Sequence, residues 1–301
     1  MRKAFAAVFL AAAVTAPAEP PDAPTTRPQA KPPSPDAVLK MLGADHRPCV
    51  ERRTGGAIDW TRGEILADGE AKVRGASGQA VAMARRAARL VAARNAVLLI
   101  SGLRVDANGA YPDIRSGRIS VEAVLKDCQE AAFEYDPMGR TVRVTLRVPL
   151  YGVRGVVKLA GVVPTQQVDT WDWPKERQGG GAADIVVIDA RKTKFQPVLF
   201  PRLESTQGKK VFDAGDVPKS ELHARALAVY VTKTAPSAQP ATQPDSRPAA
   251  RLLVLTASAS KGNSNGAAVL GDSELAELAA HPEARGCMAD GRLVILTSEP
   301  K

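Results

Sequence analysis

The sequence predicts an α+β fold, and two patterns carry this prediction. A long helical pattern runs from Ser77 to Ile100, and in residues 141–150 apolar and polar residues alternate. Apolar residues recur every three to four positions in a surface helix and every second position in a half-buried strand. We therefore expect an N-terminal strand, a long helix and an antiparallel hairpin in one layer, followed by a second small α+β module.

The first eighteen residues have the pattern of a signal peptide. Arg2 and Lys3 form a basic start, the apolar run 4–14 is too short to cross a bilayer, and Ala16-Pro17-Ala18 provides small residues for cleavage. A disordered alanine-rich N-terminus is the alternative. We expect residues 1–18 to be removed and the protein to be exported, to the periplasm or out of the cell. No cysteine follows the apolar run, so we do not expect a lipid anchor.

Two segments are rich in proline and predict disorder. Residues 19–40 indicate a tether before a first domain at 41–151, and residues 236–248 interrupt a second module at 152–299. The second segment could separate a third domain. However, about fifty residues make a poor independent core, and long loops cost little entropy. We therefore interpret residues 236–248 as an insertion in a surface loop of the second module.

In the first domain, Ser77 is a suitable N-cap and Gly102 a suitable end for the long helix. At 100° per residue, one face contains the positions expected to be buried, which are Ala80, Ala84, Ala87, Val91 and Leu98. The opposite side contains a basic cluster of Arg85, Arg86 and Arg89. This cluster could contact an anionic partner, although a solvated helix face is the alternative.

Strand patterns occupy much of the remaining chain. In the first domain they cover 58–71, with an irregularity at Gly63, then 119–125 and 141–150, with a turn signal at 136–139. In the second module they cover 184–189, 226–232, 252–257 and 292–297. A turn is indicated at Gln207-Gly208, and a short helix begins at Asp272.

Composition restricts the classes of partner. The chain of 301 residues carries a formal charge of +9, and its basic residues are spread along the sequence. Such a charge could favour anionic surfaces, or it could serve solubility alone. Because we expect export, we do not expect nucleic acid as a partner. No later apolar stretch is long enough for a transmembrane segment in the mature chain.

Cysteine and histidine give few possibilities for chemistry. The three cysteines are Cys49, Cys128 and Cys287, and we expect a disulfide between Cys49 and Cys128, with buried thiols as the alternative. His46 and Cys49 have a spacing that metals can use, but no second pair completes a site, so we expect no metal and no cofactor. Motifs of serine hydrolases, zinc proteases and P-loops do not occur, so we expect no enzyme and name no catalytic residue.

Two tryptophans are the most suggestive side chains. Trp171 and Trp173 lie two residues apart in a polar segment that ends in proline. Exposed indoles can stack on sugars or anchor a protein partner. The alternative is that at least one of them fills the core of the second module.

A resemblance rests on two long stretches. The sequence GEILADGEAKVRGASGQAVAMARRAARLVAARNAVLLISGLRV is followed by the hairpin pattern, with Arg94 and Asn95 near the helix end and Gly102-Leu103 at its exit. Residues 58–150 thereby resemble the twenty-kilodalton outer-membrane lipoprotein family, which is related to the flagellar assembly proteins P and T. The second module, in DIVVIDARKTKFQPVLFPRLESTQGKKVFD, resembles a segment that often follows this domain. The resemblance implies a structural role in the envelope or flagellum without catalysis or cofactor, although this chain lacks the lipoprotein cysteine.

We therefore expect a non-catalytic, exported structural or assembly protein of the cell envelope or flagellum. Its partners would be envelope proteins, a second copy or a cell-wall polymer. The expected contact residues are Trp171, Trp173, Arg85, Arg86 and Arg89. A carbohydrate-binding protein that recognises peptidoglycan through the tryptophan segment is the alternative, and a divergent hydrolase would need a cleft where carboxylates converge.

Overall fold

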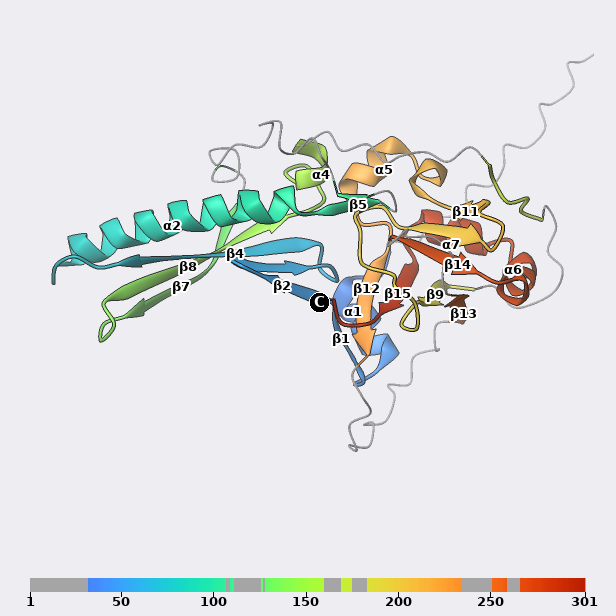
Figure 1. Ribbon diagram of the computed structural model, residues 1–301, viewed down its shortest axis with the longest axis horizontal. Coiled ribbons are helices and arrows are strands. Elements are labelled where there is room, and N and C mark those ends of the chain that lie inside the picture. Colours follow the sequence, from blue (N-terminus) through green and yellow to red (C-terminus); the bar gives the residue numbers. More distant parts are fainter. Residues whose placement is uncertain are drawn as a thin grey trace, which may run out of the picture. The chain divides into compact units, whose positions relative to one another are not determined.

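Two β-sheets form the framework of the protein, and a long helix packs on the smaller one (Figure 1). The computed structural model describes residues 32–106, 109–110, 126, 128–159, 169–174, 183–233, 251–258 and 266–300. The expected signal peptide, residues 19–31 of the expected tether, the strand expected at 119–125 and the insertion expected at 236–248 lie outside these residues. Both helices and sheets are present, so the predicted α+β class is confirmed.

The smaller sheet has five antiparallel strands in the order β2-β3-β4-β8-β7. The strands are β2 (Val50–Arg53), β3 (Gly56–Asp59), β4 (Glu64–Lys72), β7 (Gln129–Asp136) and β8 (Thr141–Pro149). The predicted turn at 136–139 joins β7 to β8, which confirms a hairpin at this point. The single strand predicted at 58–71 is wrong, because Gly63 has a φ of 66° and allows a tight turn between β3 and β4. A separate pair, β5 (Arg104–Asp106) and β6 (Gly109–Ala110), follows the helix.

The predicted long helix is α2 (Gly78–Ser101), and its ends are confirmed. The Oγ of Ser77 accepts a hydrogen bond from the N–H of Ala80, and Gly102 caps the last turn. Of the predicted buried face only Ala84 is confirmed as buried, and the rest is wrong, since Leu98 is 65% exposed and Val91 is 37% exposed. The buried positions are Ala84, Ala88, Ala92, Ala93, Ala96, Leu99 and Ile100.

A close approach between α2 and β4 explains which face is buried. A Cβ atom at Gly69 would lie 2.1 Å from the carbonyl oxygen of Ala88 and 2.3 Å from the amide nitrogen of Ala92. The backbones of β4 and α2 can approach this closely only because β4 has a glycine and α2 has alanines at the contact. The run of alanines spaced four residues apart therefore faces the sheet, and the larger Leu98 and Val91 are left outside.

The larger sheet has eight strands in the order β1-β12-β15-β9-β13-β14-β10-β11. Its four neighbouring strands β12, β15, β9 and β13 are parallel, and the first three are almost entirely buried, as in sheets covered on both faces. The strands are β1 (His46–Pro48), β9 (Ile185–Asp189), β10 (Arg202–Ser205), β11 (Lys210–Phe212), β12 (Val229–Lys233), β13 (Leu252–Ser258), β14 (Ala267–Leu270) and β15 (Leu293–Thr297). The four strands predicted in the second module are confirmed as β9, β12, β13 and β15, with small shifts at their ends.

Short helices accompany the larger sheet. They are α1 (Pro35–Leu42), α4 (Val156–Leu159), α5 (Lys219–Ala224), α6 (Asp272–Ala279) and α7 (Ala284–Ala289), with a 3₁₀ turn, η2 (Ala214–Asp216). The helix predicted from Asp272 is confirmed as α6. The Val38 side chain of α1 is fully buried in a cluster with valines of β9 and β12.

The chain enters the larger sheet before it builds the smaller one. Strand β1 pairs with β12, and α1 packs in the same apolar cluster, so residues 35–48 belong with the second module. This differs from the expected boundary at residue 41 and from the expected tether up to residue 40. The segment after residue 250 lies in the same sheet as β9. The described residues from 32 to 300 therefore belong to one compact unit with a shared core.

A buried carboxylate connects the two sheets. Glu51 of β2 accepts hydrogen bonds from the indole Nε1 of Trp60 at 2.9 Å and from Nη2 of Arg104 at 2.6 Å. The Nε of Arg104 donates to the carbonyl oxygen of Pro197 at 2.9 Å, before β10. Thr61 also donates to the carbonyl oxygen of Tyr230 in β12. The two modules are thus held together by polar groups that satisfy one another inside the core.

Candidate functional site

Residues 169–174 lie beside the edge strand β11 and position both tryptophans of the expected site. Lys210 donates its backbone N–H to the carbonyl oxygen of Asp169 at 2.9 Å, and Trp171 donates its own N–H to the carbonyl oxygen of Lys210 at 2.6 Å. The indole Nε1 of Trp173 donates to the carbonyl oxygen of Val211 at 3.0 Å. These bonds fix the segment against the sheet.

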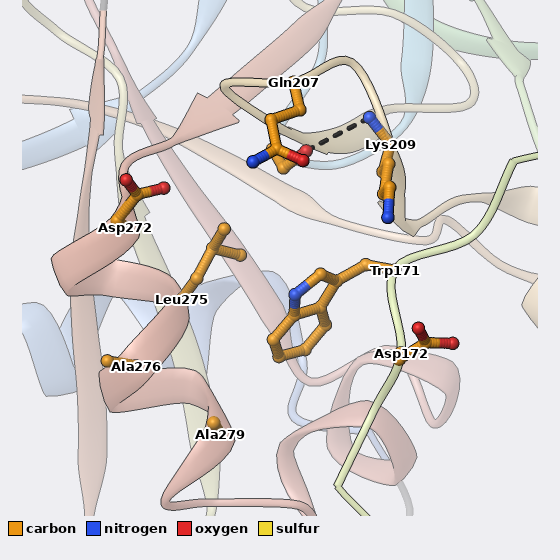
Figure 2. A pocket seen from close by; sticks show the side chains of 9 residues that line it. Trp171, Asp172, Gln207, Lys209, Asp272, Leu275, Ala276 and Ala279 are labelled. Atoms are coloured by element: carbon orange, nitrogen blue, oxygen red, sulfur yellow. Dashed lines mark hydrogen bonds between the residues drawn. The ribbon is translucent and has the colours of Figure 1, made fainter.

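A pocket of about 420 Å³ lies between this segment, the turn from β10 to β11, and helix α6 (Figure 2). The residues that line it are Trp171, Asp172, Ser205, Gln207, Lys209, Asp272, Leu275, Ala276 and Ala279. Figure 2 shows the Trp171 indole pointing toward α6, with Gln207 and Lys209 bordering the pocket from the turn. Segments that are far apart in the sequence therefore form one concave site.

The lining combines one aromatic surface with polar groups of both kinds. Trp171 and Leu275 provide apolar contact, whereas Gln207, Asp172 and Asp272 carry hydrogen-bonding side chains. The backbone N–H of Lys209 donates to the Oγ of Ser205 at 3.1 Å, which holds the turn in place. An indole next to amide and carboxylate groups can bind a ligand with an apolar ring face and several hydroxyl groups.

The two tryptophans have different roles. Their rings meet edge to face, with centroids 5.1 Å apart, and both are half-buried against the core. Trp171 lines the pocket, whereas Trp173 does not and is held by its bond to Val211. Of the expected pair, only Trp171 is therefore placed to contact a ligand in this pocket.

The three arginines of α2 lie in different surroundings. Arg85 donates from Nη2 to Oε1 of Glu130 at 2.5 Å, and its guanidinium carbon lies 4.6 Å from the centroid of the Phe133 ring, so it is directed onto β7. Arg86 is exposed and Arg89 is half-buried. The single basic cluster expected at these positions is therefore divided.

The expected disulfide between Cys49 and Cys128 is not formed, and all three cysteines are buried thiols. Cys49 precedes β2 and Cys128 precedes β7, which are the two outer strands of the smaller sheet. Four strand spacings separate these positions, or roughly 19 Å, whereas a disulfide needs Cα atoms within about 7 Å. The Sγ of Cys49 instead lies 3.6 Å from the Oγ1 of Thr297, and burial raises the pKa of this thiol to about 12.

A second surface lies on the opposite module, where β4 extends beyond β3. Strand β3 pairs with β4 only as far as Ala67, so one side of residues 69–72 has no neighbouring strand in the described part of the chain. We call residues 69–72 the β4 edge. A groove of about 660 Å³ lies along it, lined by Ala71, Lys72, Arg74, Ser77, Gln79, Ala80, Met83, Ala84 and Ala87.

Two general properties of the described residues bear on the function. Among the described residues, which lie between 32 and 300 with gaps, no group of three or more His, Cys, Asp or Glu side chains is arranged to hold a metal ion. In the same residues, no helix has the length and apolar character needed to cross a membrane.

Sequence reasoning missed most residues of both surfaces. Ser205, Gln207, Lys209 and Asp272 meet Trp171 only because β10 pairs with β14, directly before α6. The sequence does contain the turn at Gln207-Gly208 and the helix start at Asp272, but no signal in it brings them together. Met83 was missed because the wrong helix face was chosen as the buried one.

Comparison with known families gives a match to part of the chain. Residues 185–299 match the family model described as the second domain of Treponema pallidum Tp0624. The matched region begins at the first residue of β9 and extends past β15, so it covers the strands of the larger sheet other than β1 and includes the α6 wall of the pocket. No curated protein matches the chain.

Proposed function

We propose that the protein is a non-catalytic, exported component of the bacterial cell envelope or flagellum that acts by assembling with other chains. The observation that carries this proposal is the β4 edge together with the exposed apolar side chains of α2. Met83 is 59% exposed, Leu90 50% and Leu98 65%. Met83 lines the groove along the β4 edge, and Leu90 and Leu98 lie farther along the same helix. An unpaired strand edge beside an exposed apolar side chain is typical of a surface that another chain covers.

The sequence supports the same proposal. The signal-peptide pattern of residues 1–18 favours export, and the resemblance of residues 58–150 to the outer-membrane lipoprotein and flagellar assembly proteins favours a structural role. The match of residues 185–299 indicates that the second module is similar to a domain of another bacterial protein. In this proposal the chain is held in the envelope by contacts with its partners.

Position-specific cross-linking in intact cells tests this function. A photoreactive amino acid replaces Met83 in one strain and the exposed Glu277 of α6 in another, and the cells are fractionated before the cross-linked chains are identified. We expect the protein in the envelope fraction and cross-links to envelope or flagellar chains, or to a second copy, from position 83 only. Equal products from both positions, or a protein that stays in the cytoplasm with residues 1–18 intact, would contradict the proposal.

A second candidate function is carbohydrate binding, and the pocket beside Trp171 favours it. Its combination of an indole with Gln207, Asp172 and Asp272 suits a fragment of peptidoglycan or another surface glycan. Titration with soluble peptidoglycan fragments should quench tryptophan fluorescence. Trp171→Ala should abolish the quenching and Trp173→Phe should leave it, since Trp173 does not line the pocket. Unchanged quenching in Trp171→Ala would exclude this site.

A further inference from the structure

The β4 edge has backbone N–H and C=O groups that lie in the plane of the sheet and point outward, where no neighbouring strand is described. The N–H of Asp68 donates to the carbonyl oxygen of Gly55 at 2.9 Å, and the Nδ2 of Asn95 donates to the carbonyl oxygen of Asp68 at 2.7 Å. In an antiparallel strand, the N–H and C=O groups of every second residue point to the same side. The groups of Glu70 and Lys72 therefore point to the same side as those of Asp68, where β3 has ended. These two residues can form hydrogen bonds with a further strand.

We propose that this strand is β4 of a second copy, which pairs antiparallel about Ala71 and joins two five-stranded sheets into one. This proposal rests on the proposed assembly function and names one partner for it. The residues of the β4 edge and its flanks read Asp68-Gly69-Glu70-Ala71-Lys72-Val73-Arg74. A two-fold axis at Ala71 places Glu70 opposite Lys72 of the second copy and Lys72 opposite its Glu70.

Charge complementarity selects this register. Opposite charges directly across two strands stabilise pairing, and like charges destabilise it. Pairing about Glu70 would place two glutamates opposite each other, whereas pairing about Ala71 joins each glutamate to a lysine and exchanges the open N–H and C=O groups of both residues. Farther out, Asp68 and Arg74 are also opposite in sign. Backbone pairing ends there, because Gly55 already lies against Asp68.

The helix leaves room for a second copy at this point. Helix α2 lies directly over Gly69. Two residues farther along β4, Ala71 is partly exposed, whereas Val142, which pairs with Ala71 on β8, is fully buried. At the level of Ala71, β4 is therefore less completely covered than β8. The groove beside the β4 edge lies next to Ala71, where β4 is less covered. The two-fold axis brings this groove of one copy next to the same groove of the other.

The groove has apolar residues to fill this space. On the α2 side it is lined by Ala80, Ala84 and Ala87, with Met83 as its one large apolar side chain. Small residues allow helices to approach to about 8–10 Å, and a flexible methionine from each copy can fill the gap between them. The paired segment is short, so we expect an interface near the lower limit of specific ones and a dimer that depends on concentration.

Charge reversal in the chain without residues 1–18 tests this pairing by sedimentation over a range of concentrations. Glu70→Lys alone and Lys72→Glu alone each place like charges opposite one another and should weaken the dimer by on the order of tenfold. The double variant Glu70→Lys/Lys72→Glu should restore it. An equal mixture of the two single variants should also form a dimer, because one copy then carries two lysines and the other two glutamates.

Glu277→Lys on α6 is the matched control and should dimerise like the natural chain. A chain that is monomeric at all concentrations, or single variants that dimerise as well as the natural chain, would overturn the self-pairing. If the photoreactive residue at position 83 still cross-links to a different envelope chain in that case, the proposed assembly function stands and only the self-pairing is wrong. If position 83 gives no cross-link, both the assembly function and the self-pairing are wrong.

Discussion

Arg104 donates from Nη2 to Oε2 of Glu51 at 2.6 Å, and the Glu51 side chain is only 3% exposed. Arg53 also donates to this carboxylate, from Nε to Oε1 at 2.7 Å. Burial alone would raise the pKa of Glu51, but hydrogen bonds from Arg104, Trp60 and Arg53 outweigh burial and hold the pKa below its usual value. The carboxylate is therefore charged in the folded protein, at the place where the two modules meet.

Removing the charge of Glu51 should destabilise the protein strongly. In Glu51→Gln the half-buried Arg104 and Arg53 lose their common charged acceptor, and breaking a buried pair of this kind costs about 3 kcal/mol. The free energy of unfolding is measured by urea denaturation. Glu277→Gln, on an exposed helix position, should change it by less than about 0.5 kcal/mol. Equal effects of the two substitutions would show that the buried network contributes no stability.

Stability should fall in acid. The pKa of Glu51 is lowered, and that of Asp189 is lowered by the hydrogen bond from Arg191, from ordinary values of 4.5 and 3.8. The unfolded chain therefore binds more protons in acid than the folded chain. This stability is present above the ordinary values and is lost as the pH falls through the lowered ones.

Urea midpoints at pH 7, 5, 4 and 3 measure this loss. In Glu51→Gln the fall between pH 5 and 3 should be shallower than in the natural chain, because one of the two groups no longer titrates. A fall of the same steepness in both proteins would assign the acid sensitivity to other groups.

Adding one methyl group at Gly69 should be costly. The Cβ of Gly69→Ala would meet the backbone of Ala88 and Ala92 well inside contact distance, so α2 must move away from β4. We expect a loss of about 2–3 kcal/mol in the free energy of unfolding. Gly78→Ala is the control, because a Cβ there meets no atom within 4 Å, and it should be neutral or slightly stabilising. A neutral Gly69→Ala would contradict the close helix packing.

The three thiols should react only after unfolding. Burial raises the pKa of Cys49 to about 12 and raises that of Cys287 as well, so neither forms the reactive thiolate near pH 8. Titration with a thiol reagent should give little reaction in the native, unreduced protein. Three thiols per chain should react in denaturant. A single reactive thiol in denaturant would show that two cysteines pair in the protein.

Local chemistry made much of the fold predictable. Ser77 and Gly102 mark the two ends of α2 in the local sequence, and the short valine-rich and isoleucine-rich runs of β9 and β15 are typical of covered strands. The buried face of α2 was not predictable in this way. Alanines occur on several faces of this helix, and the sheet selects the face that meets Gly69, a residue distant in the sequence.

The candidate surfaces depend on pairings between distant segments. Trp171 is conspicuous in the sequence, but Asp272 reaches its pocket through the neighbouring strands β10 and β14. The charge pattern around Ala71 is visible in the sequence, but it indicates an interface only once the pairing of β4 with β3 is known to end at Ala67. Likewise, the assignment of β1 to the larger sheet follows from three residue pairs with β12 that no local pattern indicates.

The pairing of β1 with β12 also determines how the fold responds to tension. His46 lies opposite Lys233, and Thr297 lies opposite Thr232, so the start of β1 and the end of β15 are at the same end of the sheet. A force applied between α1 and the end of β15 would therefore peel β1 from β12 one pair at a time instead of shearing all pairs together. Because each backbone hydrogen bond resists only weakly by itself, β1 would detach at low load. The five-stranded sheet would carry force only after this release.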